Sequence, residues 1–196
     1  MTKKNIIGLT GPSGSGKSQA IKFLNNFDIF IIDADKVAHT LLSNNQDLID
    51  KIIKNFSNKI LDDNNMIDRK KLGSIVFSDK KNLALLNQII FPYIKLEIFD
   101  MINSCKNNKI LIDAPTLIQS GLYKICDKII VILASKDIRL KRIISRDNLS
   151  LEEATNRLDS QLSDSEYLKK ADFVIYNNSD LFNLKKNIFK IFERDL

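Results

Sequence analysis

The chain has 196 residues, of which 44% are hydrophobic, so it is long and apolar enough to form one domain with a proper core, and intrinsic disorder is excluded. Its formal net charge of +6 favours anionic partners, which include nucleic acid, acidic membrane surfaces and polyphosphate ligands, without choosing among them. Cys105 and Cys126 have no metal-type spacing, no secretory signal is apparent, and no apolar run approaches the roughly 20 residues that span a bilayer. We therefore expect a reduced, cytoplasmic protein without a membrane partner.

The first predicted element is a short buried strand at residues 6–9, followed at once by a glycine-rich turn and a helix. The turn has the spacing Gly-x-x-x-x-Gly-Lys-Ser from Gly11 to Ser18, which is typical of a P-loop in this strand and helix setting. Its glycines let successive N–H groups turn toward one phosphate chain, and the helix that begins near Lys17 adds its positive dipole end. Lys17 would then reach the β- and γ-phosphates, and the Ser18 hydroxyl would bind Mg²⁺. The alternative is a glycine-rich turn without a ligand.

A second predicted strand, residues 29–32, ends in Asp33-Ala34-Asp35. Carboxylates at the C-terminal ends of parallel strands lie where open α/β sheets bind their ligands. Asp33 is therefore a candidate catalytic base or Mg²⁺ neighbour. Asp35 suits the cap or the first turn of the next helix, where the helix dipole favours an acid.

Residues 44–104 show no strand pattern. Apolar periodicity predicts helices at 48–56, 69–76, 83–90 and 94–102, with Pro92 separating the last two. An insertion of about sixty residues is long for a plain crossover, for which a dozen or more suffice. We interpret it as a subdomain for a second substrate; the alternative is a helical pack that only covers the sheet.

A third strand, 109–112, ends in Asp113, which has the form of a Walker B carboxylate that holds Mg²⁺. After a fourth strand at 128–133, Asp137 can cap a helix whose Arg139, Arg142 and Arg146 share one face. The chain contains 24 Lys and only 6 Arg, so these arginines stand out, and the planar guanidinium suits phosphoryl oxygens. A solvated basic face is the alternative.

The remaining segments predict a lid and the last strand. Ser150-x-x-Glu153 and Ser163-x-x-Glu166 are capping-box patterns, and a polar, Arg-bearing helix pair is typical of a closing lid. A fifth strand, 173–176, leads to Asn177. The last helix is amphipathic through Leu184, Ile188 and Ile191.

Taken together, these features resemble the dephospho-CoA kinase family over nearly the whole length of the chain. The motifs that carry the resemblance are the P-loop with Leu9 and Thr10, Asp33-Ala34-Asp35, Ile67-Asp68-Arg69 before Leu72, Val76-Phe77, Leu86-Asn87, Asp113-x-Pro115, the series Arg142, Arg146, Ala154, Arg157 and Gln161, and Ala171-Asp172 with Asn177. The resemblance implies an α/β fold of the P-loop nucleoside-triphosphate hydrolase type, with three α/β/α layers and a five-stranded parallel sheet. We expect a single domain with a core at about 1–43, 105–138 and 171–196, a helical CoA-binding insertion at about 44–104 and a helical lid at about 139–170.

The same resemblance implies ATP-dependent phosphorylation of the ribose 3′-hydroxyl of dephospho-CoA, which gives coenzyme A and ADP. The expected catalytic residues are Asp33 as base, Lys17 and Arg142. The residues expected to bind ATP are Gly11, Pro12, Ser13, Gly14, Ser15, Gly16, Lys17, Ser18, Gln19, Arg142, Arg146 and Asn177. The residues expected to bind the acceptor are Asp33, Arg69, Phe91 and Pro115. Ser18 and Asp113 are the expected ligands of Mg²⁺.

Five residues depart from the usual family pattern: Pro12, Gln19, Phe91, Thr116 and Gln119. The last two lie on the acceptor side, whereas Gly16, Lys17, Ser18 and Asp33 all remain. Another small-molecule or nucleoside kinase would share the P-loop, the lid and the strand-end acid. A non-catalytic nucleotide sensor or a basic nucleic-acid-binding ATPase is the alternative of another class, but no nucleic-acid recognition motif appears. We expect ATP and dephospho-CoA as partners, no nucleic acid, and a monomer or weak homo-oligomer.

Overall fold

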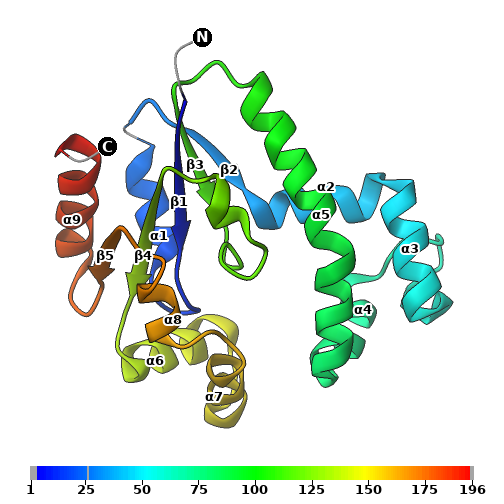
Figure 1. The fold of residues 1–196 in the computed structure, drawn as a ribbon. Helices are drawn as coiled ribbons and strands as arrows, with labels where there is room; N and C mark the ends of the chain where they lie inside the picture. The colour runs from blue at the N-terminus through cyan, green and yellow to red at the C-terminus, as the bar shows by residue number, and fades with distance from the viewer. Residues whose placement is uncertain (1–3, 26, 195–196) are drawn as a thin grey trace. The chain divides into compact units, whose positions relative to one another are not determined.

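A computed structural model describes residues 4–25 and 27–194 of the chain (Figure 1). Its strands are β1 (Asn5–Thr10), β2 (Phe30–Asp33), β3 (Lys109–Asp113), β4 (Lys128–Leu133) and β5 (Phe173–Tyr176). They form one sheet in the order β2-β3-β1-β4-β5, and β1 pairs in parallel with both β3 and β4. All five predicted strands are confirmed to within one residue at their ends. The fold class, a three-layer α/β fold around a five-stranded parallel sheet, is confirmed as well.

The strands are apolar along their length because both faces of the sheet are covered. In β4 every residue after Lys128 is buried, which is the pattern of a central strand in a parallel sheet. Helices α1 (Lys17–Leu24) and α9 (Leu181–Arg194) pack on the same side of β1 and β4 (Figure 1). The predicted apolar face of the last helix is confirmed, since Leu184, Ile188 and Ile191 all enter this core.

The chain divides into two compact units, one containing the residues up to Ile31 together with those from Lys106 onward, and the other Ile32–Cys105. The second unit is helical, as predicted. Its elements are α2 (Ala34–Asn44), α3 (Gln46–Phe56), the 3₁₀ turn η1 (Asn58–Ile60), α4 (Arg69–Ser78) and α5 (Lys80–Ser104). The insertion expected at about 44–104 lies within this unit.

The predicted helix break at Pro92 is wrong, because α5 runs without interruption from Lys80 to Ser104. An internal proline removes one hydrogen bond and crowds the carbonyl four residues earlier, at a cost of about 3 kcal/mol. Ile90, Ile94, Ile98 and Ile102 are buried at a spacing of four on both sides of the exposed Pro92. Burial of each such side chain contributes roughly 1.5–3 kcal/mol, so packing against α2, α3 and α4 outweighs the defect.

The remaining helical elements of the first unit are η2 (Leu122–Ile125), α6 (Lys136–Asp147), α7 (Leu151–Asp159) and α8 (Asp164–Leu168). Both predicted capping boxes are confirmed. The prediction that Asp137 caps α6 is wrong, because the Ser135 carbonyl closes the first turn by accepting from Arg139 N at 3.0 Å. Asp137 instead lies inside the first turn, where the dipole favours its charge. No helix in the described ranges is long and apolar enough to cross a membrane.

Candidate nucleotide site on the P-loop

The turn between β1 and α1 requires glycine for close packing as well as for backbone conformation. Gly11 and Gly16 have φ of 154° and 100°, and Gly16 is the residue that precedes α1. A Cβ on Gly11 would lie 2.2 Å from the Ile132 carbonyl oxygen, and one on Gly16 would lie 2.1 Å from Asn177 Nδ2. The loop backbone therefore lies directly against β4 and the residue after β5, which holds its shape.

The Ser15 hydroxyl is the feature of the loop that points to a bound anion. Ser15 is buried, and its Oγ has no hydrogen-bond partner among the residues that the structure describes. A buried polar atom left unpaired costs about 1–3 kcal/mol. A phosphate oxygen in the loop would be a suitable acceptor for this hydroxyl.

Lys17 and Asp113 form a nearly buried ion pair at the loop. Lys17 Nζ contacts Asp113 Oδ1, and the two side chains are only 13% and 12% exposed. The sheet register explains the meeting, because Asp113 ends β3 opposite Leu9, and the loop begins just after that point in β1. The cation predicted for phosphate and the carboxylate predicted for metal therefore lie together.

The donor set fits Mg²⁺ that arrives with a nucleotide. Within the described part of the chain, no three His, Cys, Asp or Glu side chains cluster as a metal cage. Magnesium does not need one, since it commonly takes one or two carboxylates and completes its shell with phosphate oxygens and water. Asp113 supplies a carboxylate, and Ser18 supplies an exposed hydroxyl in the first turn of α1.

Arg142, predicted as a catalytic and ATP-binding residue, extends from α6 to the P-loop and contacts the backbone there. Its Nη1 donates to the carbonyls of Gly14 at 3.1 Å and Ser15 at 3.4 Å, and its Nη2 donates to the Asn177 carbonyl at 3.1 Å. Asn177 is itself buried and donates from Nδ2 to the Ser15 carbonyl at 2.8 Å. Arg142 and Asn177 together hold the loop to the end of β5.

The other arginines of the α6 stripe have different surroundings. Arg139 is only 9% exposed and forms an ion pair of 3.1 Å with Asp164. Arg146 donates from Nε and Nη2 to the two oxygens of Asp147, both at 2.7 Å, and Arg157 Nη1 donates to the same carboxylate at 2.7 Å. The hydrogen bond from Arg146 holds the pKa of Asp147 below its ordinary value. The stripe is thus not a uniform solvated face.

Asp33 is the N-cap of α2, in the Ile32–Cys105 unit. Its Oδ1 accepts hydrogen bonds from the backbone N–H groups of Asp35 and Lys36, both at 3.0 Å. Its Oδ2 lies 3.7 Å from Lys36 Nζ. Of the two positions predicted for Asp35, the cap and the first turn of the helix, the structure shows the first turn. The capping position is the last non-helical residue, which is Asp33.

The residues predicted to bind the acceptor fall in both units. Arg69 is exposed at the start of α4, and Phe91 is half-buried on α5. Pro115 follows β3 in the first unit, and its carbonyl accepts from Thr10 Oγ1 at 3.3 Å. The structure brings the P-loop, Asp113, Arg142 and Asn177 together within the first unit, whereas Asp33, Arg69 and Phe91 belong to the second.

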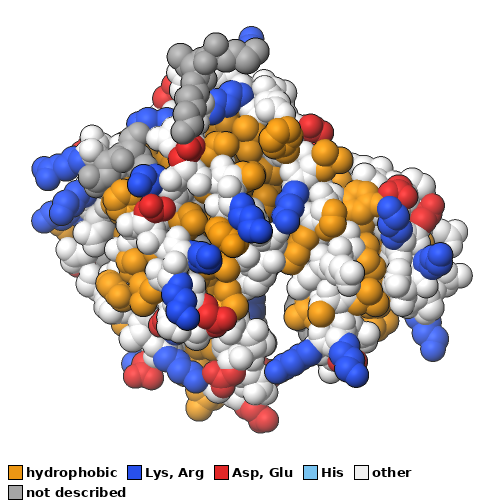
Figure 2. Space-filling view, in the orientation of Figure 1, with side chains coloured by type: hydrophobic (Ala, Val, Ile, Leu, Met, Phe, Trp, Pro, Cys, Tyr) orange, Lys and Arg blue, Asp and Glu red, His pale blue; other side chains and the backbone are white. Residues whose placement is uncertain are grey.

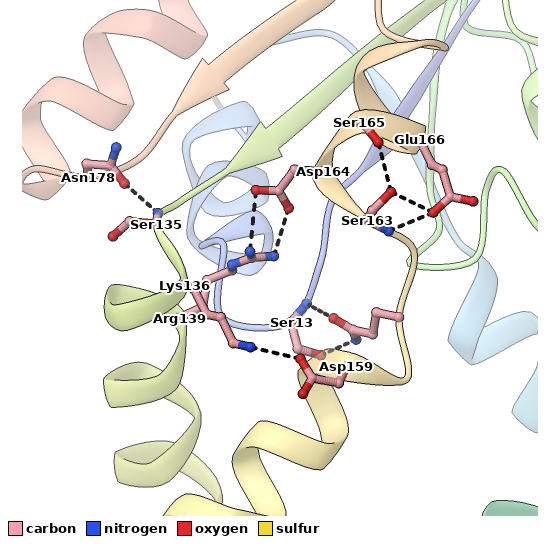
Figure 3. A network of polar contacts seen from close by, with 11 residues as sticks. Ser13, Ser135, Lys136, Arg139, Asp159, Ser163, Asp164, Ser165, Glu166 and Asn178 are labelled. Carbon is pink, nitrogen blue, oxygen red and sulfur yellow. Dashed lines mark hydrogen bonds and ion pairs between the residues drawn. The ribbon is translucent and has the colours of Figure 1, made fainter.

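One residue next to the loop received no role from the sequence. Gln161, between α7 and α8, accepts from Ser13 N at 3.0 Å and donates to Ser13 Oγ at 2.8 Å (Figure 3, the unlabelled side chain next to Ser13). The two residues are 148 positions apart, so no local spacing could indicate the contact.

Comparison with known proteins agrees with the fold and the loop. The family model for dephospho-CoA kinase matches residues 5–183. The chain is 44% identical to a dephospho-CoA kinase from Fusobacterium nucleatum over 189 residues, which cover 96% of this chain and 97% of that protein. The solved dephospho-CoA kinase from Campylobacter jejuni aligns with a TM-score of 0.72 and 38% identity, over 97% of this chain and 96% of that one.

A Thermus thermophilus protein, TT1252, shares the fold with a TM-score of 0.84 at 24% identity, over 100% of this chain and 99% of that one. The family match and the similarity to the Fusobacterium protein extend over almost the whole chain and include the P-loop. The chain therefore belongs to the dephospho-CoA kinase family.

Proposed function

We propose that this chain transfers the γ-phosphoryl group of ATP to the ribose 3′-hydroxyl of dephospho-CoA and releases coenzyme A and ADP. Membership of the dephospho-CoA kinase family supports the reaction. The observation that carries it for this chain is the nearly buried pair of Lys17 and Asp113 at the P-loop. This pair unites a phosphate-binding cation with a metal-binding carboxylate.

We assign the phosphoryl-transfer half of the reaction to residues around the loop. Phosphoryl transfer needs alignment and charge stabilisation more than covalent chemistry from the protein. The residues of the loop from Gly11 to Gln19 cradle the phosphates, Lys17 supplies positive charge, and Arg142 holds the loop carbonyls. Arg146 and Asn177 complete the ATP site. Ser18 and Asp113 would hold Mg²⁺, which supplies neutralisation of charge on the β- and γ-phosphoryl oxygens.

Asp33 is the base in this proposal. Its Oδ1 is occupied by the two N–H groups of the α2 cap, so Oδ2 is the oxygen that we assign to the acceptor hydroxyl. The two cap bonds fix the direction of the carboxylate. In a loose transition state the base orients the hydroxyl and accepts its proton late.

We assign acceptor binding to Arg69, Phe91 and Pro115, with the helical insertion at about 44–104 holding the CoA moiety. The exposed guanidinium of Arg69 suits acceptor phosphates because of its planar donor fork. We assign residues from about 139 to 170 to a lid over ATP, and the rest of the single domain to the core.

We propose further that the protein works in the cytoplasm as a monomer or weak homo-oligomer, without nucleic-acid or membrane partners. Figure 2 shows the lysine and arginine side chains of one face dispersed among apolar and acidic ones. A nucleic-acid-binding surface concentrates basic side chains in a patch or stripe instead.

The test is an ATP-dependent phosphorylation assay with dephospho-CoA against a panel of nucleosides and other hydroxyl acceptors, with and without Mg²⁺. We expect turnover with dephospho-CoA that a chelator abolishes. Preferred phosphorylation of a nucleoside would favour another small-molecule kinase. Binding of ATP without transfer to any acceptor would favour a nucleotide sensor.

A further inference from the structure

The short connection between α7 and α8, residues 160–163, is hydrogen-bonded to the P-loop through the side chain of Gln161. Ser13 N donates to Gln161 Oε1 at 3.0 Å, and Gln161 Nε2 donates to Ser13 Oγ at 2.8 Å. The backbone N–H is an obligatory donor, so it requires the oxygen of the amide, and the amide NH₂ must then face the hydroxyl. One side chain thus engages both polar groups of Ser13.

Ser13 is the second residue of a tight turn within the P-loop. Ser15 N donates to the Pro12 carbonyl at 3.2 Å, which closes a four-residue turn over residues 12–15. Gly14, the third residue of the turn, has a φ of 76°, as a type II turn requires. The N–H of the second residue makes no bond inside such a turn. Gln161 satisfies that N–H, so the contact stabilises the turn without using its internal hydrogen bond.

Two ion pairs flank Gln161 in the sequence, and they connect the α7 and α8 segment to a different part of the protein. Lys136 Nζ contacts Asp159 Oδ1 at 2.9 Å, and Arg139 Nη1 contacts Asp164 Oδ1 at 3.1 Å (Figure 3). Both pairs tie the α7 and α8 segment to α6, whereas Gln161 ties it to the loop itself. Lys136 and Asp159 are about half exposed, and such pairs stabilise little.

We propose that Gln161 is a positioning residue for the nucleotide: it holds the turn at residues 12–15 in its phosphate-binding shape before ATP arrives. A loop that is already ordered loses less conformational freedom when the phosphates bind. The contact therefore lowers the KM for ATP and leaves binding of the acceptor unchanged. This kinetic consequence rests on the proposed kinase activity, whereas the ordering of the loop does not.

Hydrogen exchange of the ligand-free protein tests the ordering directly. We expect Gln161→Ala to speed amide exchange in peptides that contain residues 11–16, and to leave peptides from β4 unchanged. The matched control is Asn156→Ala, which removes an exposed amide side chain from α7. Gln161→Glu should restore slow exchange, because a carboxylate accepts hydrogen bonds from both the N–H and the hydroxyl of Ser13.

Steady-state kinetics tests the consequence. Two lost hydrogen bonds correspond to a rise of about tenfold in the KM for ATP of Gln161→Ala, with far smaller changes in kcat and in the KM for dephospho-CoA. Ser13→Ala should raise the KM for ATP less, because it keeps the N–H. The double variant should match Gln161→Ala, because the two residues act through one contact.

Three results would overturn the assignment. The first is exchange at residues 11–16 that is unchanged in Gln161→Ala. The second is a lower KM for ATP, which would mean that the amide competes with phosphate for the loop. The third is an equal rise in the KM for both substrates. If the wild-type protein phosphorylates no acceptor, the kinase proposal fails, and the exchange comparison still decides the role of Gln161.

Discussion

The Asp33 carboxylate has different surroundings at its two oxygens, and this allows a clean substitution. In Asp33→Asn the amide oxygen can keep both cap bonds of α2, which Oδ1 now accepts. The amide nitrogen replaces Oδ2 and cannot accept a proton. We expect kcat to fall at least about a hundredfold, since general-base catalysis contributes roughly 10²–10⁴-fold, with little change in ATP affinity or thermal stability.

Asp68 offers a matched control in the same unit. It caps α4 in the same way, with Oδ1 accepting from Lys70 N at 2.8 Å and Lys71 N at 3.2 Å. Asp68→Asn should leave kcat and the melting temperature nearly unchanged. Normal turnover of dephospho-CoA by Asp33→Asn would reduce Asp33 to a capping residue.

Lys17→Ala should abolish ATP turnover and also lower stability. The substitution removes the ammonium from the nearly buried Asp113 carboxylate. Loss of one partner from a buried pair costs about 3–5 kcal/mol of stability. Because this pair is partly exposed, we expect a loss at the lower end of that range. Adding Asp113→Asn to Lys17→Ala should recover part of the stability without activity. Urea unfolding of the wild type, the two single variants and the double variant measures these changes in the free energy of unfolding. Wild-type-like turnover in Lys17→Ala would refute the P-loop assignment.

Arg142→Lys keeps the positive charge but loses the planar fork. The guanidinium spans the Gly14 and Asn177 carbonyls with two nitrogens, both at 3.1 Å, and one ammonium cannot reproduce this geometry. We expect kcat to fall at least tenfold, or about 1.4 kcal/mol of transition-state stabilisation. Lys141→Ala, at an exposed position on α6, is the control. An unchanged kcat in Arg142→Lys would leave Arg142 without a catalytic contribution.

At the scale of elements, α5 tolerates an internal proline because of what it packs against. Pro92→Ala restores an N–H to the helix interior and relieves the clash of the ring with the preceding turn. The gain of about 3 kcal/mol is offset by about 0.4–1 kcal/mol of added unfolded-state entropy, so we expect a net stabilisation of about 2–2.6 kcal/mol. Urea unfolding measures it, and a lower midpoint would mean that the ring itself stabilises the helix.

At the scale of the whole molecule, the buried thiol of Cys126 makes the free energy of unfolding depend on pH in the alkaline range. Its thiol is packed near Gly8 and donates to the Leu122 carbonyl at 3.5 Å. Burial raises the pKa of Cys126 to about 12, from an ordinary value of 9.0. Between pH 9 and pH 12 the Cys126 thiol therefore keeps its proton in the folded state, whereas the same thiol in the unfolded chain loses its proton.

The sign of the effect follows from that difference. Above pH 9 the unfolded chain binds fewer protons than the folded one, so the free energy of unfolding falls as pH rises toward 12. Below pH 9 this contribution is fully present. We expect Cys126→Ala to show a shallower loss of stability than the wild type between pH 8 and pH 10, measured by denaturant unfolding. If the stability of the two proteins falls equally steeply with pH, Cys126 is not the source of the alkaline loss of stability.

Local patterns were sufficient for the parts of this protein that local interactions determine. The five strands follow from apolar runs, and the P-loop follows from glycine spacing between a strand and a helix. The two capping boxes follow from reciprocal hydrogen bonds between residues three positions apart. Each of these signals lies within one short window of the sequence, so it can be recognised without knowing which distant residues pack against it.

Only the tertiary structure decided whether α5 continues through Pro92 and which distant residues contact the P-loop. The continuity of α5 through Pro92 depends on burial of isoleucines against other helices, which outweighs a local defect. Arg142 contacts Gly14, 128 residues away, and Gln161 contacts Ser13, 148 residues away. They meet because parallel strands bring the P-loop next to the segments that follow β4 and β5. The sequence by itself determined which groups can bind phosphate and metal. Only long-range packing decided which of those groups touch, because contacts between distant residues are set by the register of the sheet and leave no periodic trace along the chain.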